Sequence, residues 1–315
     1  MLDADALLAA ARRPLLVGVG GGGDVVGALG VAEPLARVHG ARPVVGGTTW
    51  ERIVVDAHPG PRGLDELDEL AEHLGPGTAL AGPRTHVAAS GVRLAEARTA
   101  ELTGEATLLV DPTGGPGAVV AGLEAAVGRL GADALVLVDV GGDALAHGHE
   151  PGLLSPLCDA VLLAAGAELA ERGLAVLGAV FGPGCDGELK PDEVLERVAE
   201  VAAGGGLAGA RSLTAPTAEL LERAIAHVPT EASAQPLRCF RGETGAAIIR
   251  RGRRTVELSP LGALTFFFSV PVALATAARL ARAVRGAEDL EAANDALHAL
   301  GVRTELDLER DALAS

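Results

Sequence analysis

Aromatic residues are scarce in this chain of 315 residues: they make up 2% of it, with no Tyr and a single Trp. Proteins that bind single-stranded nucleic acid stack the bases on aromatic side chains, and they need a basic surface that displaces counterions. The formal net charge of -16 is the opposite of such a surface. We therefore expect no nucleic acid, neither DNA nor RNA, as a partner.

Lysine is almost absent as well, since Lys190 stands alone beside 25 arginines. A Schiff-base lysine or the lysine of a phosphate-binding loop is therefore hard to place. The three cysteines, Cys158, Cys185 and Cys239, are far apart and odd in number, so they predict neither a disulfide framework nor a Cys-x-x-Cys metal site. We expect a reducing, cytoplasmic location, because the N-terminus has no basic secretory leader.

One segment without charge, residues 258–278, is long enough to cross a bilayer. Pro260 and Pro271 interrupt it, which favours a buried strand through Phe266–Phe268 and then a helix that Pro271 opens and that continues to Arg285. No membrane partner is expected on this interpretation. An alternative is that Phe266–Phe268 form the interface of a homo-oligomer.

The rest of the chain alternates apolar strands with helices. Strands are predicted at residues 15–19, 43–45, 107–110, 135–138 and 175–180, and helices at 25–39, 64–74, 117–130 and 191–203. This order is typical of an α/β fold with a mostly parallel, Rossmann-like sheet flanked by helices on both faces. We expect residues 1–230 to form that core with its ligand site.

The last third of the chain, residues 231–315, changes character and is expected to pack into the same domain as a hairpin plus helices. Residues 246–249 and 255–258 predict the hairpin, and the turn between them contains four arginines in five residues. Runs of surface charge are common, so a solvated hairpin tip is favoured over a phosphate clamp. A closing helix is predicted over residues 290–300.

Four consecutive glycines, Gly20, Gly21, Gly22 and Gly23, join the first predicted strand to its helix and are followed at once by Asp24. Such a loop lets backbone come close to a neighbour or adopt positive φ, and its N–H groups suit anionic oxygens. Asp24 would repel a phosphate at this helix N-terminus unless a cation lay between them. The loop predicts a phosphate bridged by a metal, or a ligand with positive charge.

A dinucleotide interpretation also exists for this loop. Gly18, Gly20 and Gly23 satisfy the Gly-x-Gly-x-x-Gly pattern, but no acidic residue that could hold a ribose follows the second strand before Glu51. A nicotinamide-dependent oxidoreductase and a tight turn of purely structural purpose both stay open as alternatives.

Five glycine-rich or acidic loops follow directly on predicted strands. They comprise residues 20–24, 48–52, 111–115, 139–143 and 182–188. Loops that follow parallel strands gather at the carboxyl edge of a sheet, where ligands bind in such folds. The sequence therefore predicts one shared site at that edge.

The clearest motif there is Asp139-Val140-Gly141-Gly142-Asp143, whose glycine pair lets two carboxylates face the same space. Carboxylate oxygens suit a hard divalent cation such as magnesium, so Asp24, Asp139 and Asp143 are the predicted metal ligands. Asp143 is also a candidate catalytic residue; the alternative is that it caps the next helix.

Glu51 is the candidate general base, and Arg52 would orient a carboxylate or phosphate of the substrate. Further residues are predicted to contact the ligand. They are Gly20, Gly21, Gly22, Gly23, Asp24, Thr48, Thr49, Trp50, Asp111, Gly141, Gly142, Asp186 and Glu188. For Asp111 the alternative role is that of a turn former.

At these motifs the chain resembles the prokaryotic family catalogued as domain of unknown function 1152. The resemblance is carried by Gly18–Gly30, Thr49–Arg52, Asp56–Gly60, Asp139–Asp143, Ser155–Leu157 and Thr304–Asp307. It covers nearly the whole chain and implies one family domain with a site at the carboxyl edge. It implies no particular reaction or substrate.

Together these observations predict a metal-assisted enzyme that acts on a phosphorylated, nucleotide-like or amino-acid-derived small molecule. A divalent cation, magnesium above all, is the expected cofactor, and a nucleotide is a possible ligand. Were the ligand an amine, the acids would bind it directly without a metal. A protein that senses a nucleotide without turning it over is the alternative from another functional class.

Overall fold

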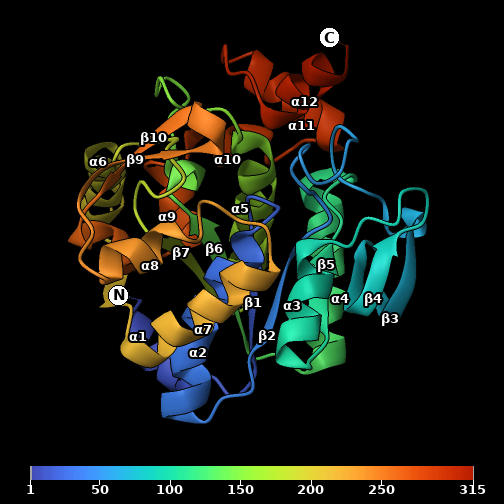
Figure 1. The fold of residues 1–315 in the computed structure, drawn as a ribbon, viewed down its shortest axis with the longest axis horizontal. Coiled ribbons are helices and arrows are strands. Elements are labelled where there is room, and N and C mark those ends of the chain that lie inside the picture. Colours follow the sequence, from blue (N-terminus) through green and yellow to red (C-terminus); the bar gives the residue numbers. More distant parts are fainter. Residues whose placement is uncertain (1, 315) are drawn as a thin grey trace.

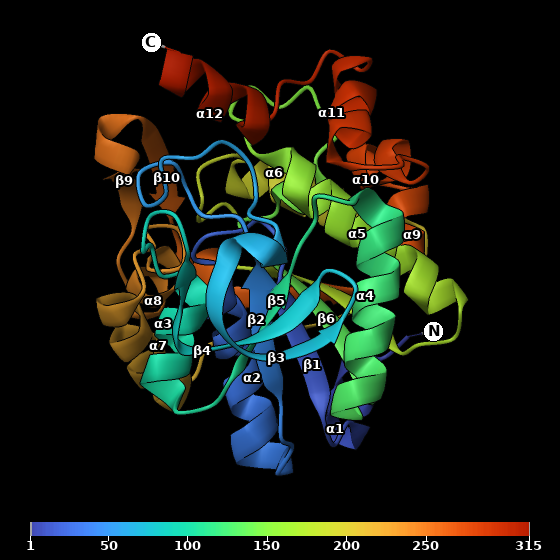
Figure 2. The same ribbon diagram turned by 90° about the vertical axis from the view of Figure 1, so that its right-hand side faces the viewer.

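A nine-stranded sheet runs through the middle of the molecule in the computed structural model, which describes residues 2–314 (Figures 1 and 2). The strands are β1 (Pro14–Gly18), β2 (Val44–Thr48), β3 (Leu67–Gly75), β4 (Thr78–Val87), β5 (Thr107–Val110), β6 (Ala134–Val140), β7 (Val176–Phe181), β8 (Leu207–Ser212), β9 (Gly245–Ile249), β10 (Arg254–Leu258) and β11 (Leu264–Phe268). Strands β9 and β10 form a hairpin that is a separate two-stranded sheet, and the other nine strands make up the main sheet.

Twelve helices are present in residues 2–314. They are α1 (Ala4–Ala10), α2 (Asp24–His39), α3 (Ala95–Thr103), α4 (Gly115–Leu130), α5 (Pro156–Glu171), α6 (Pro191–Ala203), α7 (Ala215–His227), α8 (Gln235–Phe240), α9 (Val270–Ala275), α10 (Arg279–Val284), α11 (Leu290–His298) and α12 (Glu305–Ala314). Short 3-10 turns occupy Leu64–Glu66, Asp143–Leu145, Arg250–Gly252 and Pro260–Ala263.

The strand order is β3-β4-β5-β2-β1-β6-β7-β11-β8. The five neighbouring strands from β5 to β7 are parallel to one another. Antiparallel strands extend the sheet at both ends, with β4 pairing β5 and β11 pairing β7. The predicted fold class, α/β with a mostly parallel sheet and helices on both faces, is confirmed.

Each parallel strand is buried on both faces, which explains the continuous apolar runs in the sequence. In β1, Leu15 and Val17 join the core under α4 and α5, while Leu16 joins the core under α2 and α7. This alternation follows from the two-residue period of a strand. The sheet is thereby fixed between two helical layers, and its upper, carboxyl edge is left for other segments to cover.

The C-terminal part of the chain covers that edge. β11 lies within the main sheet, between β7 and β8. The β9–β10 hairpin, α11 and α12 lie at the carboxyl end of the parallel strands in both views (Figures 1 and 2). Residues beyond position 230 therefore share a sheet with the preceding core and cover the carboxyl edge of its parallel strands.

The prediction of a helix at residues 64–74 is wrong. A 3-10 turn leads there into strand β3, which pairs antiparallel with β4 at the end of the sheet. The buried residues Leu67 and Leu74 are seven positions apart, which fits two helical turns equally well. In the strand the two side chains join different cores, Leu67 beside Leu109 and Leu74 beside Leu108, so long-range pairing with β4 decided against the local pattern.

The charge-free segment forms the predicted strand, β11, and then α9, which has Pro271 in its first turn. The helix ends at Ala275, however, and α10 begins separately at Arg279, so the single helix predicted up to Arg285 is wrong. Phe267 and Phe268 are buried within the main sheet and Phe266 is half-buried, so a subunit interface through Phe266–Phe268 stays a prediction. No helix within residues 2–314 is long and apolar enough to span a bilayer.

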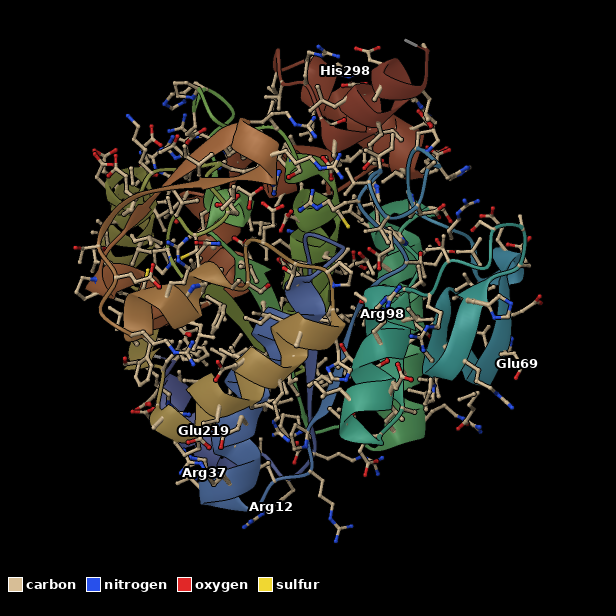
Figure 3. The ribbon with its side chains drawn as sticks, in the orientation of Figure 1. Arg12, Arg37, Glu69, Arg98, Glu219 and His298 are labelled. Carbon is tan, nitrogen blue, oxygen red and sulfur yellow. The ribbon has the colours of Figure 1, made fainter. Side chains whose placement is uncertain are left out.

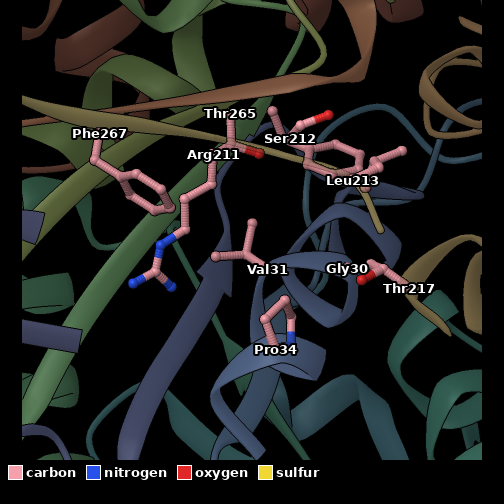
Figure 4. A pocket seen from close by; sticks show the side chains of 10 residues that line it. Gly30, Val31, Pro34, Arg211, Ser212, Leu213, Thr217, Thr265 and Phe267 are labelled. Carbon is pink, nitrogen blue, oxygen red and sulfur yellow. The ribbon is translucent and has the colours of Figure 1, made fainter. Parts of the chain in front are cut away.

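A small hollow of about 310 Å³, including space open to solvent, lies on the α2 side of the sheet (Figure 4). Val31 and Pro34 of α2, Arg211 and Leu213 near β8, and Phe267 of β11 line it. None of the site residues predicted from the sequence is among its lining residues. The hollow is therefore separate from the predicted site.

Helical glycines offer a matched test of this packing. A Cβ on Gly27 of α2 would lie 2.5 Å from Val140 Cγ2, whereas one on Gly128 of α4 would meet nothing within 4 Å. We expect Gly27→Ala to lower the free energy of unfolding by about 1–3 kcal/mol through overpacking. Gly128→Ala should raise it by up to about 1 kcal/mol, because alanine favours the helix. Urea unfolding of both variants checks this; equal effects of the same sign would contradict the packing described.

Candidate active site

The sheet has a topological switch point between β1 and β6, because the chain builds β2 and β5 on one side of β1 and then adds β6 on the other. Ligands bind at the carboxyl edge near such a point in open α/β sheets. The loops after four strands meet here: Gly22 N donates to Trp50 O at 2.7 Å, and Gly184 N donates to Gly141 O at 2.7 Å. Of the five loops predicted to gather here, these four are joined in two pairs by hydrogen bonds, whereas Asp111 in the loop at residues 111–115 bonds within its own turn.

The glycine loop after β1 packs against the protein itself. Gly21 and Gly22 have φ angles of +76° and +54°, which favour glycine. A Cβ on Gly21 would lie 2.6 Å from Trp50 O, and one on Gly23 would overlap Thr230. Close contact with the chain's own atoms therefore explains the missing side chains, and binding of anionic oxygens by this loop stays a prediction.

The loop positions Asp24 at the start of α2, where it joins Asp139 of β6 and Asp159 of α5. One carboxylate oxygen from each of these three residues lies within 4.8 Å of the others. We call them the first acidic triad. Asp24 Oδ2 accepts from Gly20 N at 3.1 Å and Asp139 Oδ2 from Ala144 N at 3.1 Å. The Oδ1 atoms of Asp139 and Asp159 are buried and have no partner among the described residues.

A second acidic triad lies beside the first and consists of Asp143, Asp186 and Glu188, again with oxygens within 4.8 Å of one another. Gly141 and Gly142, with φ angles of +125° and +118°, turn the chain from the first triad into the second. The side chain of Asp143 does not cap the 3-10 turn that it begins, so the capping alternative is not supported. We call the two triads together the acidic centre.

Burial is the main cause of high pKa values in the acidic centre. It raises the pKa of Asp24 to about 6 and that of Asp186 to about 7. It also raises the pKa of Asp139, Asp143 and Asp159 well above the usual value, and the charges of neighbouring carboxylates add to this effect. The carboxylates repel one another and lack water, which is the condition that a bound cation would relieve.

Glu188 differs from the other acids because donors surround it. Its Oε2 accepts from the backbone N–H of Leu154 and Ser155, both at 2.8 Å, and its Oε1 accepts from Ser155 Oγ. Arg254 Nη2 lies 2.9 Å and Arg250 Nη1 3.5 Å from Oε1. Burial alone would raise its pKa, but Arg254, Arg250, the Ser155 hydrogen bond and Arg52 together lower it. Glu188 therefore anchors arginines at the edge of the acidic centre.

The arginine-rich hairpin turn is only partly the solvated tip that the sequence favoured. Arg251 and Arg253 are exposed. Arg254 is buried, with 8% of its surface exposed, and Arg250 points with it toward Glu188. Folding of the C-terminal hairpin over the sheet edge thus brings two guanidiniums into the site.

Arg52 supplies a third guanidinium. Its side chain passes over the glycine loop, since a Cβ on Gly22 would lie 3.2 Å from Arg52 Cγ. Burial would lower the pKa of Arg52, but the charges of Glu188 and Asp24, among others, raise it above the ordinary value. No acidic residue of the described chain lies within 4.0 Å of its nitrogens, although Arg250 and Arg254 each pair with Glu188. Arg52 is the unpaired cation of the site.

Two other residues of the loop after β2 have their hydrogen-bond partners outside the acidic centre, although the charge of Arg52 also acts on Glu51. Trp50 Nε1 donates to Glu309 Oε2 of α12 at 3.0 Å, and Gly60 N donates to the same oxygen at 2.9 Å. Glu51 Oε1 accepts from Ala95 N at the start of α3 at 2.5 Å. Burial raises the pKa of Glu51 to about 7, within the range that proton transfer at neutral pH requires. Trp50 thus ties the loop to the C-terminal helix.

Of the predicted residues Thr48, Thr49 and Asp111, only Thr48 has a described contact next to the acidic triads. Thr48 Oγ1 accepts from Cys158 Sγ at 3.5 Å, next to the first acidic triad, and Thr49 Oγ1 is buried with no partner among the described residues. Asp111 Oδ1 accepts from both the N–H and the hydroxyl of Thr113. Asp111 therefore stabilises its own turn, and no described contact joins it to the acidic centre.

Several site residues were missed from the sequence. Asp159 lies in an otherwise apolar helix, where a buried carboxylate is rare, and that was the available signal. Glu305 of α12 accepts from the N–H groups of Leu157 and Cys158 at 3.0 and 2.8 Å and so holds the start of α5. No local sequence pattern predicts that Glu305 or Arg254 contacts this edge, because both residues lie far along the chain from the strands that form it.

The family profile described as "Protein of unknown function (DUF1152)" matches residues 15–313, nearly the whole chain. The chain therefore belongs to this family, as the motifs indicated. No curated protein matches the chain, and no solved structure matches it either.

The acidic centre makes a prediction for the protein without metal. Folded Asp24 and Asp186 keep their protons up to about pH 6 and 7, while unfolded carboxyls release theirs near pH 4. The folded state holds more protons in between, so the free energy of unfolding should fall as pH rises from 5 to 8, by on the order of 1 kcal/mol through Asp24 alone. Urea unfolding in EDTA measures this. Asp24→Asn should flatten the profile, and a wild-type profile that rises would contradict the electrostatics described.

Proposed function

We propose that this member of the DUF1152 family is a divalent-cation-dependent enzyme that acts on a phosphorylated small molecule, of nucleotide-like or amino-acid-derived structure. Its reaction centre is the acidic centre at the switch point of the sheet. Magnesium is the proposed cation, since it prefers oxygen ligands and retains waters that leave room for substrate oxygens.

The observation that carries the proposal is a pair of oxygens that nothing in the described chain satisfies. Asp139 and Asp159 are each 2% exposed, and their Oδ1 atoms have no hydrogen-bond partner among the described residues. A buried polar atom without a partner costs about 1–3 kcal/mol, and more if it is charged. Three carboxylates within 4.8 Å of one another add repulsion. A cation between Asp24, Asp139 and Asp159 would remove both costs.

Arg52 supports a phosphorylated compound as the substrate. Arg52 has no ion pair within 4.0 Å in the described chain, yet it lies among the acids and above the glycine loop. A guanidinium recognises phosphate by two parallel hydrogen bonds. The proposed substrate phosphate therefore bridges the cation and Arg52, which also answers the repulsion between phosphate and Asp24 that the sequence alone implies.

Proton transfer is assigned to Glu51. Its raised pKa of about 7 lets it hold or accept a proton near neutral pH. Ala95 N fixes one of its oxygens, which orients the carboxyl group. Asp143, whose pKa burial also raises, is the second candidate for this role.

Cation binding is tested with Mn²⁺ or Mg²⁺ by isothermal titration and thermal unfolding. At a hundred times its dissociation constant the cation should stabilise the wild type by about 2.7 kcal/mol. Asp159→Asn, which keeps the shape but removes the charge, should weaken binding at least about tenfold. The matched control is Glu219→Gln in α7, an exposed acid at the opposite end of the molecule from His298 of α11 (Figure 3).

Turnover is tested by release or transfer of phosphate from a panel of phosphorylated metabolites with Mg²⁺ present. The wild type and Glu219→Gln should turn over the same compounds. Glu51→Gln should bind cation normally and lose at least about a hundredfold in kcat, the usual contribution of general acid–base catalysis. An unaltered melting temperature with millimolar Mn²⁺ and Mg²⁺ would overturn the proposal.

A further inference from the structure

We infer that the acidic centre holds two divalent cations side by side, the second bound by Asp143 and Asp186. This inference rests on the proposed function and extends it from one cation to a two-cation centre. It also narrows the substrate to one whose phosphate oxygens bridge two metal ions.

Geometry provides the first argument. The second acidic triad brings oxygens of Asp143, Asp186 and Glu188 within 4.8 Å of one another, as the first triad does with its own. Asp186 is 3% exposed, and its Oδ1 has no hydrogen-bond partner among the described residues. The second triad therefore repeats the feature that marks the first: a buried carboxylate oxygen left without a donor.

Glu188 has no carboxylate oxygen without a donor, and this difference decides which residues bind the second cation. Its oxygens accept from two backbone N–H groups, from Ser155 Oγ and from Arg254. Asp143 and Asp186 accept no hydrogen bond from a described side chain that would compete in the same way. Two carboxylates with several waters are an ordinary ligand set for Mg²⁺. Glu188 holds the arginines next to that set.

The two triads are close enough to act as one centre. Asp139 is flanked by charge from both, because Asp24 and Asp186 each act on it. Asp143 likewise faces Asp159 of the first triad and Glu188 of its own. The turn at Gly141 makes this possible, since any Cβ there would overlap the Asp186 carboxylate. The inference places the two cations side by side, with a bridging ligand between them.

Charge provides the second argument. Six carboxylates form the acidic centre, and Arg52, Arg250 and Arg254 face it, which leaves three net negative charges when all groups are ionised. One divalent cation leaves one negative charge, whereas two leave one positive charge; an ionised Glu305 lowers either balance by one. A phosphate is repelled from a negative pocket. The centre with two cations therefore attracts an anionic substrate more strongly than the centre with one.

The arrangement also suggests separate roles for the cations and for Arg52. Two-metal sites clamp the attacking and leaving oxygens of a phosphoryl group. Arg52 comes from the loop after β2, and Arg250 and Arg254 come from the β9–β10 hairpin; the charge of Glu188 acts on all three. The substrate class is a phosphate monoester or anhydride, with its phosphate between the cations and Arg52.

The test counts Mn²⁺ ions on the full-length protein by isothermal titration and by electron paramagnetic resonance. The wild type should bind two ions per chain, and their mutual coupling should broaden the six-line spectrum of isolated Mn²⁺. Asp186→Asn should bind one ion and restore the narrow six-line spectrum. Asp143→Asn serves as the second variant in case the first fails to fold, which circular dichroism reports. Glu219→Gln is the control and should bind two.

Each outcome separates this inference from the function that it extends. A wild type that binds one ion, lost in Asp159→Asn and kept in Asp186→Asn, would overturn the second cation and leave the proposed function in place. Two ions that persist in both Asp186→Asn and Asp143→Asn would place the second ion elsewhere and overturn the ligand assignment. A wild type that binds none would overturn the proposed function itself.

Discussion

The constraint on which the rest of this structure depends is the burial of several carboxylates at one edge of the sheet. Removing a carboxylate from water is costly, and placing others beside it adds repulsion. Asp24, Asp139, Asp143, Asp159 and Asp186 respond with raised pKa values, so the metal-free protein keeps its acidic centre by holding protons there. Gathering these carboxylates does not stabilise the fold, because apolar residues of similar size would pack there without the cost of desolvation and repulsion. Their assembly is the observation on which the proposed cation site rests.

The surroundings of the acidic centre are organised to hold it in place. Glu188 collects backbone and arginine donors, and Glu305 fixes the start of the helix that carries Asp159. Glu309 holds the loop after β2 through the single Trp of the chain. Two of these three acids come from the final helix. The C-terminal segment therefore holds the surroundings of the acidic centre in place, and truncation there would remove contacts to residues almost 150 positions earlier in the sequence.

The loop of four glycines illustrates how a correct local prediction can have a different cause. The sequence indicated a bare turn between strand and helix, with Asp24 at the helix start, and both are present. The sequence could not show that Trp50 O and Thr230 occupy the space which the missing side chains leave. Helix 64–74 failed for a related reason: the spacing of Leu67 and Leu74 suits a helix, and only pairing with β4 turns it into a strand.

The sequence by itself determined the order of strands and helices, the parallel core of the sheet and the convergence of its loops, because local apolar patterns and the two-residue period of strands act over short distances. It also indicated Asp24, Asp139, Asp143, Asp186 and Glu188. Only the tertiary structure decided that these acids form two adjacent triads, that Asp159 completes the first, and that Arg250 and Arg254 turn inward. Those decisions depend on how segments far apart in the chain pack together, and no local pattern of residues carries that information.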